Sequence, residues 1–333
     1  MSCPYCFKPT DKEQRVQIDE RHAAIRAAVT PLPGSVPYDQ ARPLSVPEAC
    51  DRGTMLDCLC HNMPHIAREE WLATCEAGRI LDDDQTPVAA HHIVRAGERY
   101  LHLKPAQCEP DVCADIRVIF EDEAILVVNK PAPLPAHPSG RFNRNTLQYI
   151  LNAVWHSIKP RGVHRLDANT TGVTVLCKSR EFARTVQPQF ERGEVDKMYL
   201  ARVRGHPPID EFTCDAPVSA EAGKLGGRIV DASGLAAFTE FRVLARHADG
   251  TALLEVRPRT GRTNQIRVHL WHLGFPIVGD AAYLADGAVG ETQTLTVDDP
   301  PLCLHAYRIT FHHPLSKERV EFEAEPPAWA IMG

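Results

Sequence analysis

The chain has 333 residues, 44% of them hydrophobic and 24% charged, which is typical of a globular protein with one large domain and a smaller one. No apolar run approaches the roughly 18 residues that a membrane helix needs, and the N-terminus has no apolar core that could serve as a signal peptide. Eleven cysteines without a regular frame favour a reducing compartment, so we expect a cytoplasmic protein that does not bind membranes.

The net charge of -6 is unevenly distributed along the chain. Residues 159–204 carry 10 basic residues against 5 acidic ones. Because attraction to a nucleic acid depends on the local charge, a positive surface in this region is compatible with an RNA partner. The alternative is that these side chains only solvate exposed faces.

The first 47 residues are dotted with proline and show little periodicity, which predicts an extended leader over 1–47. Cys3 and Cys6 have the spacing of half a zinc site. No second Cys-x-x-Cys pair follows, so we expect no metal site, with zinc binding as the alternative.

Residues 48–106 have the pattern of a small α+β domain. Thr54 can cap a first helix, whose apolar face carries Met55, Leu56, Leu59 and Met63. A second helix over 67–78 is apolar at Trp71, Leu72 and Cys75 and is stopped by Gly78. Short strands follow. This order of elements resembles the small RNA-binding domain first seen in a ribosomal protein, most closely in EAGRIL and VRAGERYLHL.

A linker over 107–114 then leads to a large domain over 115–333. Its first residues form two β-rich runs, 118–120 and 125–128, joined by an acidic turn, which predicts a hairpin. Strand candidates dominate the rest, with helices expected at 146–157, 180–192 and 263–273. Because the strands do not alternate regularly with helices, we predict an α+β domain with a mixed or antiparallel sheet.

Common cofactor and hydrolase motifs are absent from the sequence. It has no phosphate-binding loop, no dinucleotide-binding glycine motif, no zinc-protease helix and no serine elbow. His91–His92 and His312–His313 are adjacent pairs whose side chains diverge on a strand, so neither forms a metal-binding face. We therefore expect no cofactor.

The stretch GVHRLDANTTGVTVLCKS, residues 162–179, places Asp167 on a turn before an apolar strand, and Gly172 permits tight backbone geometry there. On the predicted helix 263–273, one face carries Thr263, Arg267 and Leu270. An arginine within about 4–6 Å would keep a buried aspartate ionised, and an ionised carboxylate in a dry site can act as a nucleophile. From spacing alone, such a pair is more often a structural salt bridge.

HRLDANTTG, residues 164–172, resembles the H-R-L-D-x-x-T-[ST]-G motif of the RluA-type pseudouridine synthases, which isomerise uridine in ribosomal or transfer RNA. The similarity extends over about residues 115–328, through EDEAILVVNKPAPLPAHP, DKMYLARVRG, RPRTGRTNQIRVHLWHLGFPIVGDAAY and LCLHAYRITFHHP. Pro133 stands where the family usually has glycine, and Asn264 where it usually has histidine.

The resemblance implies a pseudouridine synthase fold and a role for individual residues. Asp167 would be the catalytic nucleophile or base, Tyr199 would stack on the target base, and Arg267 would pair with Asp167. Arg165 would fill the space that a flipped-out base leaves. The other residues assigned to substrate binding are His164, Lys130, Arg262 and Leu270, of which Lys130 and His164 would support the walls of the site. Tyr199 could instead be a packed strand aromatic, and His164 a structural histidine.

The sequence thus predicts a monomeric, cofactor-independent RNA pseudouridine synthase with a small N-terminal accessory domain. The isomerisation breaks and re-forms one bond to ribose without redox chemistry, which agrees with the absence of cofactor motifs. One alternative is a non-catalytic RNA-binding or ribosome-assembly factor on the same fold. A weaker alternative is a metal-dependent hydrolase that uses some of the 16 histidines.

Overall fold

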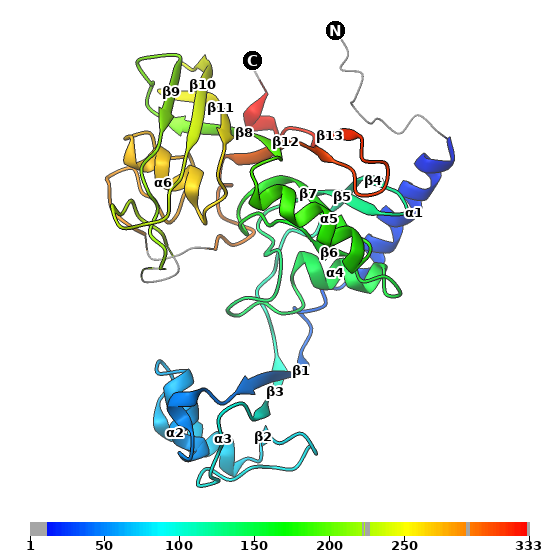
Figure 1. The fold of residues 1–333 in the computed structure, drawn as a ribbon, viewed down its shortest axis with the longest axis vertical. Coiled ribbons are helices and arrows are strands. Elements are labelled where there is room, and N and C mark those ends of the chain that lie inside the picture. Colours follow the sequence, from blue (N-terminus) through cyan, green and yellow to red (C-terminus); the bar gives the residue numbers. More distant parts are fainter. Residues whose placement is uncertain (1–11, 222, 224–226, 291–293, 332–333) are drawn as a thin grey trace. The chain divides into compact units, whose positions relative to one another are not determined.

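The computed structural model describes residues 12–221, 223, 227–290 and 294–331, which fall into two units (Figure 1). Unit 1 comprises Met1–Pro33 and Glu109–Gly333, and unit 2 comprises Gly34–Cys108. The chain therefore leaves unit 1 and returns to it, so unit 2 is an insertion. This differs from the linear order of leader, small domain, linker and large domain predicted from the sequence.

The predicted extended leader over 1–47 is wrong for the residues that the structure describes. Helix α1 spans Lys12–Ala28 and belongs to unit 1, while strand β1 spans Tyr38–Ser45 and belongs to unit 2. Among the described side chains of α1, only Ile18 and Ile25 lie in the hydrophobic core. A helix with so narrow an apolar stripe gives almost no periodic signal. Cys3 and Cys6 lie outside the described residues.

Apart from β1, the elements of unit 2 follow the predicted order of two helices and then short strands. It contains the 3-10 turn Glu48–Cys50, helices α2 (Met55–Asn62) and α3 (Arg68–Glu76), and strands β2 (Ile80–Leu81) and β3 (Arg99–Gln107). The antiparallel sheet has the order β1–β3–β2. The hydroxyl oxygen of Thr54 accepts a hydrogen bond from the backbone amide of Asp57 at 3.2 Å and so caps α2, as predicted. Trp71 and Cys75 are buried, but Leu72 is exposed.

A mixed sheet forms the centre of unit 1. Its strands are β4 (Arg117–Glu121), β5 (Ile125–Lys130), β6 (Arg161–Gly162), β7 (Thr171–Cys177), β8 (Asp196–Arg204), β9 (Glu211–Cys214), β10 (Thr239–Arg246), β11 (Thr251–Pro258), β12 (Leu304–His312) and β13 (Arg319–Glu323). The spatial order is β4–β5–β7–β12–β8–β11–β10–β9, with β6 beside β7 and β13 beside β12. Only β7 and β12 pair in parallel within the described sheet. The predicted α+β class and the β4–β5 hairpin are confirmed.

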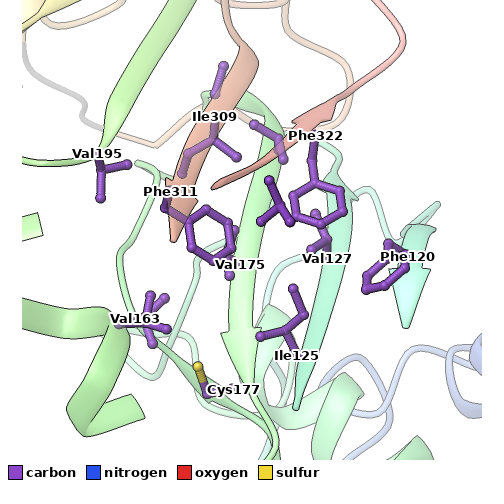
Figure 2. Packing of buried hydrophobic residues seen from close by; sticks show 14 of the residues in the cluster. Phe120, Ile125, Val127, Val163, Val175, Cys177, Val195, Ile309, Phe311 and Phe322 are labelled. Carbon is purple, nitrogen blue, oxygen red and sulfur yellow. The ribbon is translucent and has the colours of Figure 1, made fainter. Parts of the chain in front are cut away.

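Apolar layers cover both faces of the half of the sheet that contains β5 and β7. On one face, Ile125, Val127 and Val175 pack with Phe322 of β13, as Figure 2 shows, and helix α5 (Arg180–Glu191) contributes to the same cluster. On the other face, Leu126 and Leu176 pack against α1 and helix α4 (Leu147–Val154). Burial on both faces explains the continuous apolar runs in these strands.

Helix α6 (Gln265–His272) packs against the β8–β11 half of the sheet. It begins two residues later than the predicted helix 263–273, because Asn264 adopts a left-handed conformation with φ 58°. Asparagine tolerates this conformation better than most residues do. The last element that the structure describes is the short 3-10 turn Ala328–Ala330.

Candidate active site

A pocket of about 610 Å³ opens on unit 1 where segments from five parts of the chain meet. Its walls come from the loop between β6 and β7, the end of α5, the start of β8, residues 258–267 before and within α6, and Leu304 of β12. Asp167, Tyr199 and Arg267 all line it. The structure therefore brings together the three residues to which the sequence analysis assigned catalysis.

The loop that carries Asp167 is held by backbone contacts on both sides. The Thr170 amide donates to the Asp167 carbonyl at 3.1 Å and closes a turn, and the next carbonyl, of Ala168, accepts the Leu134 amide at 2.9 Å. These bonds leave the carboxylate side chain free to point outward, and it is 28% exposed. The acid is thus placed on a rigid turn at an accessible position.

Gly172, at the start of β7, lets the loop end close to the neighbouring strand. Its φ is +119°, and a Cβ built there would lie 2.2 Å from the Ala306 carbonyl oxygen of β12. Only glycine accommodates both the dihedral angle and this approach. The predicted need for a glycine at this turn therefore has a specific origin, the parallel pairing of β7 with β12.

Lys130 holds the loop that carries Asp167 through backbone contacts in the protein interior and does not line the pocket. Its side chain is fully buried, and its Nζ donates to the carbonyl oxygens of Pro131, Leu134 and Ala168 at 2.8, 2.9 and 3.2 Å. Burial lowers the pKa of Lys130 to about 7, although the Asp167 carboxylate acts in the opposite direction. Lys130 therefore has the wall-supporting position that the resemblance implied rather than a substrate-contacting one, because its ammonium is occupied with backbone carbonyl oxygens.

His164 also has a structural contact. Its Nε2 accepts the Val175 amide of β7 at 3.0 Å, and its ring stacks on Phe190 with centroids 4.9 Å apart. Burial, together with the nearby Lys197 ammonium, lowers the pKa of His164 to about 3. The ring is therefore a neutral acceptor that completes the ladder of β7 while its face lines the pocket.

Arg267 contacts Asp167, but its principal partner is Asp280. One guanidinium nitrogen, Nη1, lies 3.7 Å from Oδ2 of Asp167, whereas Nε and Nη2 donate to Asp280 at 2.8 and 2.7 Å. The Arg267 and Asp280 side chains are only 3% and 0% exposed. Burial disfavours the charged guanidinium, but the two hydrogen bonds to Asp280 outweigh it and raise the pKa of Arg267. The arginine is permanently charged and held in one orientation.

Further contacts fix this guanidinium from its other side. Nη1 donates to the Asn264 side-chain oxygen at 3.3 Å, and the Asn264 amide donates to the Tyr283 hydroxyl at 3.1 Å. The guanidinium carbon lies 5.0 Å from the centre of the Tyr283 ring. Asn264, the residue that departs from the family pattern, is thus part of the arginine's support.

Tyr199 and Lys197 project from β8 into the same pocket. Burial, reinforced by the Asp167 carboxylate, raises the pKa of Tyr199, so the phenol keeps its proton. Burial lowers the pKa of Lys197 to about 8, and its Nζ donates to the Thr260 carbonyl at 3.0 Å. The two residues lie on one side of β8 because they are two positions apart.

The remaining predicted residues divide between the rim and the core. Arg165 is exposed at the pocket rim, with Nη1 3.2 Å from Nε2 of His137. Arg262 is exposed on the opposite wall, and its Nε donates to the Ala236 carbonyl at 3.0 Å. Leu270 is fully buried in the apolar cluster under α6 and does not line the pocket, so its assignment to substrate binding is wrong.

Sequence reasoning missed Asp280 and Lys197, although both left a signal. Asp280 is the only acid in the stretch FPIVGDAAY, and an acid in an apolar stretch needs a buried partner. Lys197 precedes Tyr199 by two residues in a strand, and this spacing places both side chains on the same face. Neither signal identifies which partner the residue meets.

The described part of the chain has neither a metal-binding cluster nor a membrane-spanning helix. No group of three or more histidine, cysteine, aspartate or glutamate side chains there could hold a metal ion. None of the described helices has the length and apolar character needed to cross a membrane.

The fold and this site define an RNA-modifying class of proteins. A sequence model of the family described as RNA pseudouridylate synthase matches residues 124–272. The dual-specificity RNA pseudouridine synthase RluA of Escherichia coli is 35% identical over 62% of this chain and 91% of its own length. The chain therefore belongs to the RNA pseudouridine synthases of the RluA type, enzymes that isomerise uridine in RNA.

Other relatives extend the same similarity. The human pseudouridylate synthase RPUSD2 is 34% identical over 67% of this chain, which spans 42% of the human protein's length. The solved structure of human RNA pseudouridylate synthase domain containing 1 superimposes with a TM-score of 0.52 at 26% identity, covering 64% of this chain and 84% of that chain. The residues that the family model matches, 124–272, all lie in unit 1.

Proposed function

We propose that this protein converts uridine in ribosomal or transfer RNA to pseudouridine, with Asp167 as the nucleophile or base, Tyr199 as the stacking partner of the base, and Arg267 as a positioning residue. The observation that carries the proposal is the contact of Arg267 with Asp167 in an open pocket lined by Tyr199. Arg267 places a permanently charged guanidinium 3.7 Å from the Asp167 carboxylate, and a carboxylate exposed in such a pocket can act as a nucleophile. The nine free cysteines that the structure describes agree with a cytoplasmic location, and we propose that the protein acts as a monomer.

The pocket has room for a nucleoside that has been extruded from its stack. Base flipping costs a few kcal/mol, and stacking on an aromatic side chain returns about 1–3 kcal/mol. Tyr199 offers its ring beside the carboxylate, and its protonated phenol adds no second negative charge next to Asp167. To Arg165, which is exposed at the rim, we assign the role of occupying the gap that the flipped base leaves in the RNA.

Arg267 pairs with both Asp280 and Asp167, and Asp280 is the stronger partner. Asp167 therefore has no cation that is bound to it alone. The guanidinium makes its two short bonds with Asp280, and the 3.7 Å approach to Asp167 leaves that carboxylate free to move toward a substrate. A carboxylate tied into a bidentate salt bridge would lose this freedom. The arrangement favours an enzyme over the alternative of a non-catalytic RNA-binding factor.

The test uses Asp167→Asn in the full chain. Cellular RNA that carries 5-tritiated uridine and comes from a strain lacking the gene is incubated with the protein, and tritium release reports the isomerisation. We expect Asp167→Asn to bind this RNA as the wild type does and to release no tritium above background. The Asn side chain keeps the shape of the loop but cannot supply an ionised oxygen.

The matched control is Asp249→Asn, which removes another arginine-paired carboxylate at an exposed position of unit 1. This control should release tritium at the wild-type rate. Substantial release by Asp167→Asn would contradict the role of Asp167. No release by the wild-type protein from any RNA fraction would contradict the proposed activity itself.

A further inference from the structure

A second, strongly basic groove lies on unit 1 away from the active-site pocket. It has a volume of about 510 Å³ and is lined by residues of α4, β6 and α5 and the segment before β6. Four of these residues are cations, Lys159, Arg161, Arg180 and Arg184, and all four are exposed. None of the described residues that line this groove is acidic. In a chain of net charge -6, such a concentration of positive charge requires an explanation.

The four cations are not neutralised by neighbouring carboxylates. None forms an ion pair with a described acidic side chain, whereas Arg192, Arg259 and Arg308 elsewhere on unit 1 each do. Arg180 and Arg184 lie one helical turn apart on α5, so both project from the same face. Unpaired like charges that share one face repel each other unless an anion binds between them.

A smaller hollow of about 270 Å³ connects this basic groove to the active site. It shares Gln148 and Gly162 with the basic groove, and it shares Val163, His164 and Arg165 with the active-site pocket. The three depressions therefore follow one another along the surface of unit 1. Arg165, held by its contact with His137, stands at the junction between the pocket and the hollow.

We propose that the basic groove binds the phosphate backbone of the RNA strand that flanks the target uridine, reaching it through the hollow beside Arg165. This rests on the proposed function, because it describes the path of the same RNA. Arg161 and Arg165 are four residues apart, so extended chain between them spans at most about 14 Å, and the cations continue beyond Arg161 onto α5. The groove's cations, three arginines and one lysine, form a row that begins near the nucleoside pocket. A row of positive charges of this kind is suited to bind a polyanionic strand rather than a single small anion.

The test compares oligouridylates of about 2 and about 20 nucleotides, because the short probe extends little beyond the pocket and the long one also covers the groove. Both are measured on the full chain with Asp167→Asn, which prevents turnover. The test variant adds Arg180→Gln and Arg184→Gln. A matched control adds Arg204→Gln and Lys317→Gln, two exposed cations of unit 1 that line none of the three depressions.

We expect the test variant to bind the long probe about 5- to 20-fold more weakly and the short probe unchanged. The slope of log K against log salt for the long probe should decrease by about 1.4, because each phosphate that the variant no longer neutralises accounts for about 0.7 of the slope. The control should keep the affinity and the slope. The variant Arg180→Lys/Arg184→Lys, which retains both charges, should restore most of the binding.

Three outcomes would overturn the inference: equal affinity of the Asp167→Asn protein for the two probes, an equal loss in the control, or no change in the salt slope. As a second measurement, 4-thiouridine placed 3′ or 5′ of the centre of the long probe should crosslink to peptides containing residues 159–187. Crosslinks confined to the pocket would also contradict it. Tritium release is scored separately, so failure of the proposed isomerisation and failure of the groove are distinguishable.

Discussion

The role of Asp280 can be tested by removing only its charge. In Asp280→Asn the side chain keeps its shape, but the buried guanidinium of Arg267 loses the carboxylate that accepts its two shortest hydrogen bonds. Both side chains are almost completely excluded from solvent. Breaking a buried ion pair of this kind costs about 3–5 kcal/mol, and the remaining amide oxygen places the expected loss at about 3 kcal/mol.

That loss corresponds to a decrease in Tm of about 6–12 °C for a unit of this size. Differential scanning calorimetry of the full chain measures it directly. The matched control is Asp249→Asn, whose carboxylate also pairs with an arginine, Arg202, at 2.8 Å but is 56% exposed. Because surface pairs contribute about 0–1 kcal/mol, the control should change Tm by less than about 4 °C.

Activity gives a second measure of the same contact. Without Asp280, the Asp167 carboxylate is the nearest acid for Arg267, so we expect the guanidinium to pair with it more closely and single-turnover isomerisation to slow at least about tenfold. The double variant Arg267→Met/Asp280→Leu should recover part of the stability but none of the activity. If Asp280→Asn loses no more stability than Asp249→Asn, the reasoning about the buried pair is wrong.

Two further predictions concern Leu270 and His164, whose contacts in the structure are structural ones. Leu270→Ala should lower the free energy of unfolding by about 2–5 kcal/mol, since the side chain is fully buried, while the folded protein binds oligouridylate with unchanged affinity; weaker RNA binding without loss of stability would show that Leu270 does contact substrate. The pKa of His164 is 6.5 in the unfolded chain and about 3 in the folded protein, so between these values the unfolded chain binds a proton that the folded protein does not. The contribution of His164 to the free energy of unfolding is therefore complete above pH 6.5 and decreases as the pH falls toward 3. His164→Gln should therefore lose less stability than the wild type between pH 7 and pH 5 in urea titrations, with the exposed His156→Gln as control, and equal losses in all three proteins would refute this.

Much of unit 1 was predictable because its signals are local. The apolar runs of β5 and β7 identify buried strands, and the turn with Gly172 identifies the position of Asp167. The placement of Arg267 on a helix was also predictable from local spacing. The sequence could not show that Asn264, the residue before α6, adopts a left-handed conformation. The helix therefore begins at Gln265 rather than at the predicted residue 263.

The errors arise where a contact joins segments that are distant in the chain. Arg21 of α1 pairs with the buried carboxylate of Glu121, 100 residues later, at 2.8 Å, and no local pattern reveals such a partner. Lys130 illustrates the same limit, because its three carbonyl partners depend on how two loops fold together. Leu270 shares a helix face with Arg267, but its short side chain ends in the core while the longer arginine reaches the pocket.

The insertion of unit 2 sets the order in which the protein can fold on the ribosome. Helix α1 ends at Ala28, and β4, which it covers, begins at Arg117, 89 residues later (117 − 28). At a synthesis rate of about 5–20 residues per second, about 4–18 seconds pass between the synthesis of the end of α1 and that of the start of β4. Unit 2 is translated within this interval and can form its own core first. The first helix that the structure describes therefore docks only after unit 2 has been synthesised, and a nascent chain stalled before β4 would expose the face of α1 that carries Ile18 and Ile25.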